Sequence, residues 1–96
     1  MHEMGIASSI LEAVRKELLL YPQYRAAKVQ VRIGEFAGVD QNSLQFCFDA
    51  IVKDSPFAPL ELGIEMSSGD ELDLSFIEMD DGEKETEKEI EAATLV

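Results

Sequence analysis

The chain is poor in cysteine and histidine, with one of each among its 96 residues. The single cysteine, Cys47, excludes an internal disulfide framework and any zinc site built on paired Cys-x-x-Cys ligands. Cys47 falls on the apolar stripe of a predicted helix without a second histidine or a nearby base, so we interpret it as a small buried hydrophobe. No carboxylate pair or phosphate-binding loop is recognisable, and we therefore do not expect an enzyme.

Basic residues are also scarce, with 8 Lys and Arg against 20 Asp and Glu and a formal charge of −12. Residues 1–60 carry 7 acidic and 6 basic groups, whereas residues 61–96 carry 13 and 2. Such an acidic half repels phosphate backbones, which disfavours nucleic-acid binding, but it leaves a basic protein surface as a suitable partner.

Long hydrophobic runs are absent too. No stretch approaches the roughly 18 apolar residues of a membrane span, and no basic segment precedes an apolar run as in a signal peptide. We therefore expect a cytoplasmic protein with no membrane partner. The length is that of one domain able to fold around its own core.

Residues from about 4 to 20 predict an amphipathic helix, because apolar residues recur at helical spacing with charged residues on the other side. Its apolar stripe consists of Ala7, Ile10, Leu11, Val14 and Leu18. Tyr21-Pro22 ends the helix, since proline disfavours helical geometry in the residue before it. Residues 28–33 then alternate strictly between apolar and polar, which predicts a half-buried strand.

A second helical pattern follows a segment with two glycines and contains Leu44, Cys47, Phe48 and Ile51. Asp40 stands at its start, where we expect the helix N-cap, accepting a hydrogen bond from the backbone amide near Asn42 or Ser43. That structural role requires no metal. The sequence Asp54-Ser55-Pro56 ends this helix.

Two further alternating stretches predict strands joined as a hairpin. The first spans residues 60–66, and the second places Leu72, Leu74 and Phe76 on one face. The turn lies between them, with Gly69 best able to take a positive φ. The expected fold is α+β, a single small domain with a three-stranded sheet and two helices on one face, in the order α-β-α-β-β.

From Asp80 onward the chain is acidic and has few apolar residues. We expect a partly helical or disordered extension, because Ile90 and Leu95 are too few to anchor it. The predicted division is therefore a domain at 1–80 and an acidic tail at 81–96.

Met1-His2-Glu3 brings an α-amine, the only histidine and a carboxylate within a few bonds. If Met1 is retained, its amine, the amide nitrogen of His2 and the imidazole form one chelate of two fused rings. Nitrogen-rich, nearly square-planar surroundings suit Ni(II) or Cu(II). The competing interpretation is that His2 is an ordinary solvated side chain.

Three segments in order, MHEMGIASSILEAV, VRIGEFAGVDQNSLQFCFDAI and SGDELDLSFIEMD, resemble the HypA/HybF family of nickel metallochaperones in [NiFe]-hydrogenase maturation. The resemblance covers roughly residues 1–80. It implies a nickel-binding domain in which His2 is the essential ligand, helped by the Met1 amine, the backbone amides of His2 and Glu3, and the side chain of Asp40. The implied partners are the hydrogenase large subunit or maturation factors, including the family's GTPase partner.

The chain departs from this family where its members carry a zinc-binding insertion with two Cys-x-x-Cys pairs, since here LELGIEM runs directly into SSGDELDL. We therefore expect Ni(II) and no zinc. Two hypotheses stay open, a nickel-binding accessory protein and a zinc-less paralogue that acts as an interaction module or hydrogenase-associated subunit without metal transfer. The sequence does not indicate an oligomeric state.

Overall fold

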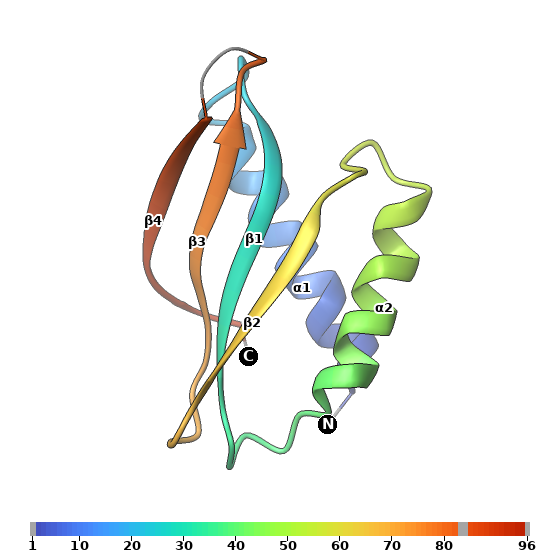
Figure 1. The fold of residues 1–96 in the computed structure, drawn as a ribbon, viewed down its shortest axis with the longest axis vertical. Helices are drawn as coiled ribbons and strands as arrows, with labels where there is room; N and C mark the ends of the chain where they lie inside the picture. The colour runs from blue at the N-terminus through green and yellow to red at the C-terminus, as the bar shows by residue number, and fades with distance from the viewer. Residues whose placement is uncertain (1, 83–84, 96) are drawn as a thin grey trace.

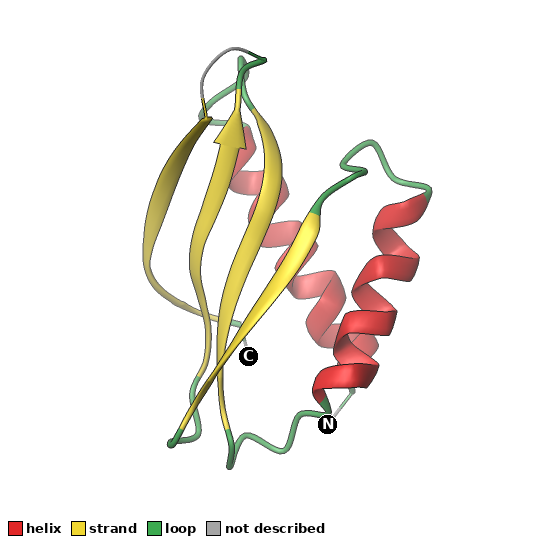
Figure 2. Ribbon diagram, viewed as in Figure 1, coloured by secondary structure: helices red, strands yellow, loops and turns green. Residues whose placement is uncertain are grey.

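The computed structural model describes residues 2–82, the backbone of 85–94, and Leu95. Two helices and four strands follow one another along the chain, with a mixed sheet as one layer and the helices as the other (Figures 1 and 2). They are α1 (Glu3–Leu18), β1 (Arg25–Gly34), α2 (Gln41–Lys53), β2 (Glu61–Ser67), β3 (Leu72–Asp80) and β4 (Glu85–Thr94). The α+β class, the two helices on one face and the order α-β-α-β-β over residues 1–80 are confirmed.

The strand order in the sheet is β2-β1-β3-β4. β1 pairs in parallel with β2 on one side, with Val29 opposite Leu62, and antiparallel with β3 on the other, with Val29 opposite Ile77. The predicted hairpin between β2 and β3 is therefore wrong, because β1 lies between them. The reason is the β1-α2-β2 crossover, since a strand, a helix and a strand in succession place the two strands in parallel.

The turn between β2 and β3 crosses the end of β1 instead of joining neighbouring strands. Backbone nitrogens at the end of β1 donate to the turn, from Gly34 to the Glu71 carbonyl at 2.7 Å and from Phe36 to the Gly69 carbonyl at 3.0 Å. Gly69 does not take a positive φ, contrary to the prediction, and among described residues only Gly38 and Gly82 do. Glycine is needed at position 34 instead, because a Cβ there would overlap the backbone of Gly69.

The acidic extension is a correction to the sequence prediction. In place of helix or disorder, the backbone of residues 85–94 forms β4, which pairs antiparallel with β3 and covers its outer edge. Leu95 donates its backbone amide to the Leu72 carbonyl at 3.0 Å and packs against the core. A boundary between residues 80 and 81 stays a prediction, although the strands on either side of it share one sheet.

A β-bulge in β3 also changes which side chains face the core. Against β1 the register of β3 shifts between Leu74 and Phe76, so Ser75 is an extra residue there, and the pairing with β4 is also irregular at this point. Leu72 and Leu74 are buried as predicted, but the buried positions then continue at Ile77 and Met79. Phe76 is only partly buried, and its predicted place on the apolar face with Leu72 and Leu74 is wrong.

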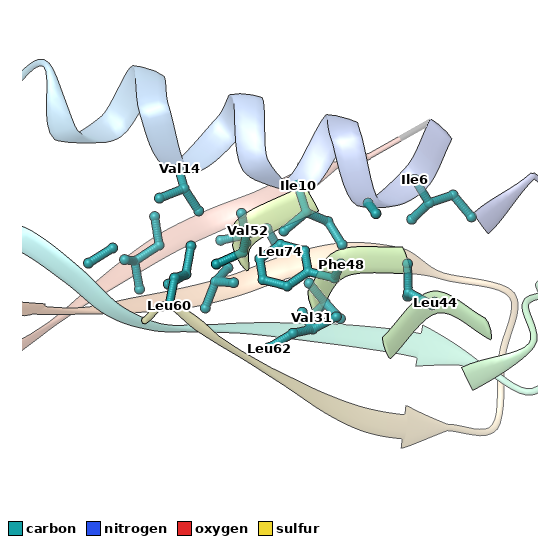
Figure 3. Packing of buried hydrophobic residues seen from close by; sticks show 14 of the residues in the cluster. Ile6, Ile10, Val14, Val31, Leu44, Phe48, Val52, Leu60, Leu62 and Leu74 are labelled. Carbon is teal, nitrogen blue, oxygen red and sulfur yellow. The ribbon is translucent and has the colours of Figure 1, made fainter. Parts of the chain in front are cut away.

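The core lies between the helices and the sheet (Figure 3). Phe48 of α2 is fully buried at its centre, between Ile10 of α1 and Val31 of β1 (Figure 3). Cys47 packs against this cluster as a hydrophobe, but it is only partly buried and not buried as predicted. Among the described residues no polar or charged side chain is buried. The described part of the core is therefore entirely apolar.

Candidate metal site

His2 is the N-cap of α1 and has extended backbone angles, φ −83° and ψ 95°. Its imidazole is exposed and makes no capping hydrogen bond. The first helical bond runs from the Ile6 nitrogen to the His2 carbonyl at 3.2 Å. Backbone amides ahead of Ile6 consequently have no helical carbonyl to bind, as at every helix start, and that includes the amide of Glu3. Met1, the first of the predicted ligands, lies outside the described residues.

Glu3 is the first residue of α1 and connects it to the start of α2. Its Oε2 accepts a hydrogen bond of 3.1 Å from the backbone nitrogen of Asp40. This bond is the main reason that the pKa of Glu3 lies below its ordinary value, and the contact with its own backbone amide lowers the pKa further. Glu3 is therefore held ionised beside the N-terminus.

Asp40 is the N-cap of α2, as the sequence predicts. Its Oδ1 accepts a hydrogen bond of 3.0 Å from the backbone nitrogen of Ser43, and its own carbonyl accepts the first helical bond from Leu44. This confirms its structural role. The carboxylate also stands next to Glu3, because the same residue provides the amide that Glu3 binds.

The structure thus brings three predicted site residues, His2, Glu3 and Asp40, to one end of the helix layer, where the N-terminus lies beside the start of α2 (Figure 1). In the part of the chain that the structure describes, no group of three or more His, Cys, Asp or Glu side chains is arranged to hold a metal ion. The described side chains at this end therefore do not form a metal site by themselves.

Sequence reasoning did not single out the apolar side chains at this end. Met4, Phe36, Phe46 and Met66 are all large and exposed. The exposure of Phe46 could have been predicted, because Phe46 stands two positions from Leu44 and so falls outside the apolar stripe of α2. Phe36 and Met66 could not be placed together without knowing that the turn after β2 meets the end of β1.

Comparison with known proteins identifies the family. The family profile for hydrogenase/urease nickel incorporation, metallochaperone, hypA, matches residues 1–79. The comparison with solved structures gave no match. The family's description is of a metallochaperone, which agrees with the expectation that the chain is not an enzyme.

Similar curated proteins bear the name hydrogenase maturation factor HypA. The protein of Desulfatibacillum aliphaticivorans is 39% identical over 66 residues, which is 68% of this chain and 51% of that protein. The one of Chlorobaculum parvum is 37% identical over 65 residues, covering 68% and 58%. The one of Desulfosudis oleivorans is 41% identical over 68 residues, covering 68% and 57%.

The matched region spans somewhat more than half the length of these relatives. None of the helices in residues 2–82 is long and apolar enough to cross a bilayer. The profile match over most of the chain and the identity to several relatives agree on one assignment. This chain belongs to the HypA family of hydrogenase maturation factors.

Proposed function

We propose that this chain binds Ni(II) as cargo at its N-terminus and passes it to a protein of hydrogenase maturation, with the hydrogenase large subunit or a maturation GTPase as recipient. The ligands are the Met1 amine, the backbone amide and imidazole of His2, and the backbone amide of Glu3, with the carboxylate of Asp40 beside them. The observation that carries the proposal is the 3.1 Å bond from the Asp40 amide to Glu3, which holds the N-terminus against the start of α2.

The local structure supports such a ligand set. The imidazole of His2 is exposed, and the amides at the start of α1 have no helical partner, so a metal can displace their protons without breaking the helix. Glu3 keeps its carboxylate occupied by the Asp40 amide, which makes it a positioning residue for its neighbour. Its negative charge also favours a divalent cation nearby.

Delivery requires a site that can be opened. Ni(II) held by one side chain and terminal backbone nitrogens sits at the surface, where a recipient can replace the ligands one at a time. Binding releases protons from the amide nitrogens and needs a neutral imidazole, so affinity falls as the pH falls. The chain has only one thiol, and we propose that it carries no structural zinc.

Calorimetric titration of Ni(II) into untagged protein beginning at Met1 tests the proposal. One equivalent should bind, and His2→Ala should lower the affinity at least about tenfold, which corresponds to about 1.4 kcal/mol. Cys47→Ala is the matched control, because it removes the only thiol from a position outside the site, and it should bind as the parent does. Equal weak binding by the parent and His2→Ala would contradict nickel transfer and favour an interaction module without metal.

A further inference from the structure

The end of the molecule that holds His2 and Glu3 is formed by three segments, residues 2–8, 34–46 and 65–72. Hydrogen bonds join them, from Asp40 to Glu3 at 3.1 Å, from Glu35 to the Ser67 carbonyl at 2.9 Å, and from Gly34 to the Glu71 carbonyl at 2.7 Å. In Figure 1 they occupy the lower end, where the N-terminus, the start of α2 and the ends of β1 and β2 lie. We call this surface the N-terminal end.

The N-terminal end carries most of the large exposed apolar side chains. It carries four of the six large exposed hydrophobic residues of the described chain, namely Met4, Phe36, Phe46 and Met66. Phe36 and Phe46 are each 74% exposed. Exposing large apolar side chains to water is unfavourable in free energy, so a group of them marks an interaction site. Aromatic and methionine side chains are enriched at the centres of protein interfaces.

The charges of the N-terminal end have one sign. Its three segments contain six carboxylates and no lysine or arginine, the carboxylates being Glu3, Glu35, Asp40, Glu65, Asp70 and Glu71. The nearest arginine along β1, Arg32, is paired with Glu65 at 2.9 Å. The N-terminal end thus combines exposed apolar side chains with carboxylates.

This combination selects the kind of partner. Nucleic acids and anionic membranes are repelled by the carboxylates, and so is a second copy of the same end. A protein segment with an apolar centre and flanking Lys or Arg side chains meets both features, since opposite charges steer the encounter and apolar contacts hold the complex. We propose that the N-terminal end is a docking surface for a basic amphipathic segment of a partner protein. Docking at this surface requires no bound nickel. The proposal rests on the proposed function only in that the docked partner would receive Ni(II).

A titration of the full chain without metal tests this surface. The probe is a short amphipathic helical peptide made only of leucine and lysine, followed by amide chemical shifts and by fluorescence anisotropy. Shift changes should fall on residues 2–8, 34–46 and 65–72, and the affinity should decrease with salt. A peptide of leucine and glutamate should not bind.

The chain offers a matched pair of variants. Phe36→Ser with Phe46→Ser should weaken peptide binding about tenfold or more, because it removes the apolar contacts. Leu19→Ser with Leu20→Ser removes side chains of similar exposure, 68% and 69%, from the other end of α1, and should change the affinity less than twofold. All four side chains are exposed, so circular dichroism should show both variants folded.

Three results would overturn the docking surface: no binding of the leucine-lysine peptide, shift changes confined to β4, or equal weakening by both double variants. Because nickel is absent, each of these leaves the nickel site unaffected. Conversely, loss of nickel binding in His2→Ala with normal peptide binding separates the two proposals.

Discussion

The Oε2 of Glu3 accepts a hydrogen bond of 3.1 Å from the backbone nitrogen of Asp40, joining the first residue of α1 to the N-cap of α2. The two residues are 37 positions apart in the sequence. It therefore connects the residue that follows His2 directly to the start of α2.

The first prediction concerns pH. Because the Asp40 amide lowers the pKa of Glu3 below its ordinary value of 4.5, the ionised carboxylate stabilises the fold above pH 4.5, and that contribution is lost as the pH falls through the lowered pKa. The side-chain carboxyl carbon of Glu3 should therefore titrate with a midpoint below 4.5. Glu3→Gln should remove the part of the Asp40 amide shift change that follows this titration, and a Glu3 midpoint at or above 4.5 would contradict the bond.

The second prediction separates the two roles of Asp40. Asp40→Ala removes the cap on the Ser43 amide and should lower the free energy of unfolding by about 0.5–2 kcal/mol. Asp40→Asn keeps a capping oxygen and should be nearly as stable as the parent in urea. If Asp40 also contacts nickel, Asp40→Asn should weaken nickel binding while stability is retained, whereas unchanged affinity would limit Asp40 to capping.

A third prediction compares two glycines. A Cβ at Gly34 would overlap the Gly69 backbone, so Gly34→Ala should force the turn away and destabilise the fold by about 1–3 kcal/mol or more. Gly5 in α1 has open space at the same position, and Gly5→Ala should stabilise by about 0.5–1 kcal/mol through helix propensity. Thermal unfolding of both variants measures these changes in stability. If Gly34→Ala left the stability unchanged, the turn at Gly69 would not pack against Gly34 as closely as the structure shows.

The fourth prediction uses two phenylalanines of α2. Phe48 is fully buried, so Phe48→Ala should cost about 3–5 kcal/mol of unfolding free energy. Phe46 is exposed, and Phe46→Ala should change stability by no more than about 0.5 kcal/mol. Denaturant unfolding distinguishes them, and similar losses for both would mean that Phe46 is part of the core.

Local patterns predicted the elements better than their pairing. The helices, the cap at Asp40 and the alternating strands follow from spacing of side chains within about a dozen residues. The position of β1 between β2 and β3 depends on contacts across the whole chain, and a turn rich in serine and glycine fits a hairpin as well as a crossing. The β1-α2-β2 succession was the signal that favoured parallel pairing.

Two further differences have local physical causes. The extra residue Ser75 reverses the alternation of β3, so Ile77 and Met79 replace Phe76 on the buried face. The acidic segment 85–94 has little strand propensity of its own, and it becomes β4 because the edge of β3 offers unpaired backbone groups. Neither feature is visible in composition or periodicity.

The site residues stay a prediction, and the contact between two of them was not predictable from the sequence. His2, Glu3 and Asp40 were named from sequence and resemblance, and the structure places them at one end. The hydrogen bond from the Asp40 backbone amide to Glu3 could not be predicted, because every residue except proline has a backbone amide and the sequence does not indicate which one a carboxylate binds.

The central claim is that Ni(II) is bound through the terminal amine together with His2. The most direct test compares untagged protein beginning at Met1 with the same protein acetylated on the Met1 amine, following the visible absorption of square-planar Ni(II). Acetylation removes one nitrogen ligand and leaves His2, Glu3 and Asp40 unchanged. We predict that the absorption develops with one equivalent of nickel in the free-amine protein and is lost on acetylation, and identical spectra from both proteins would contradict the account.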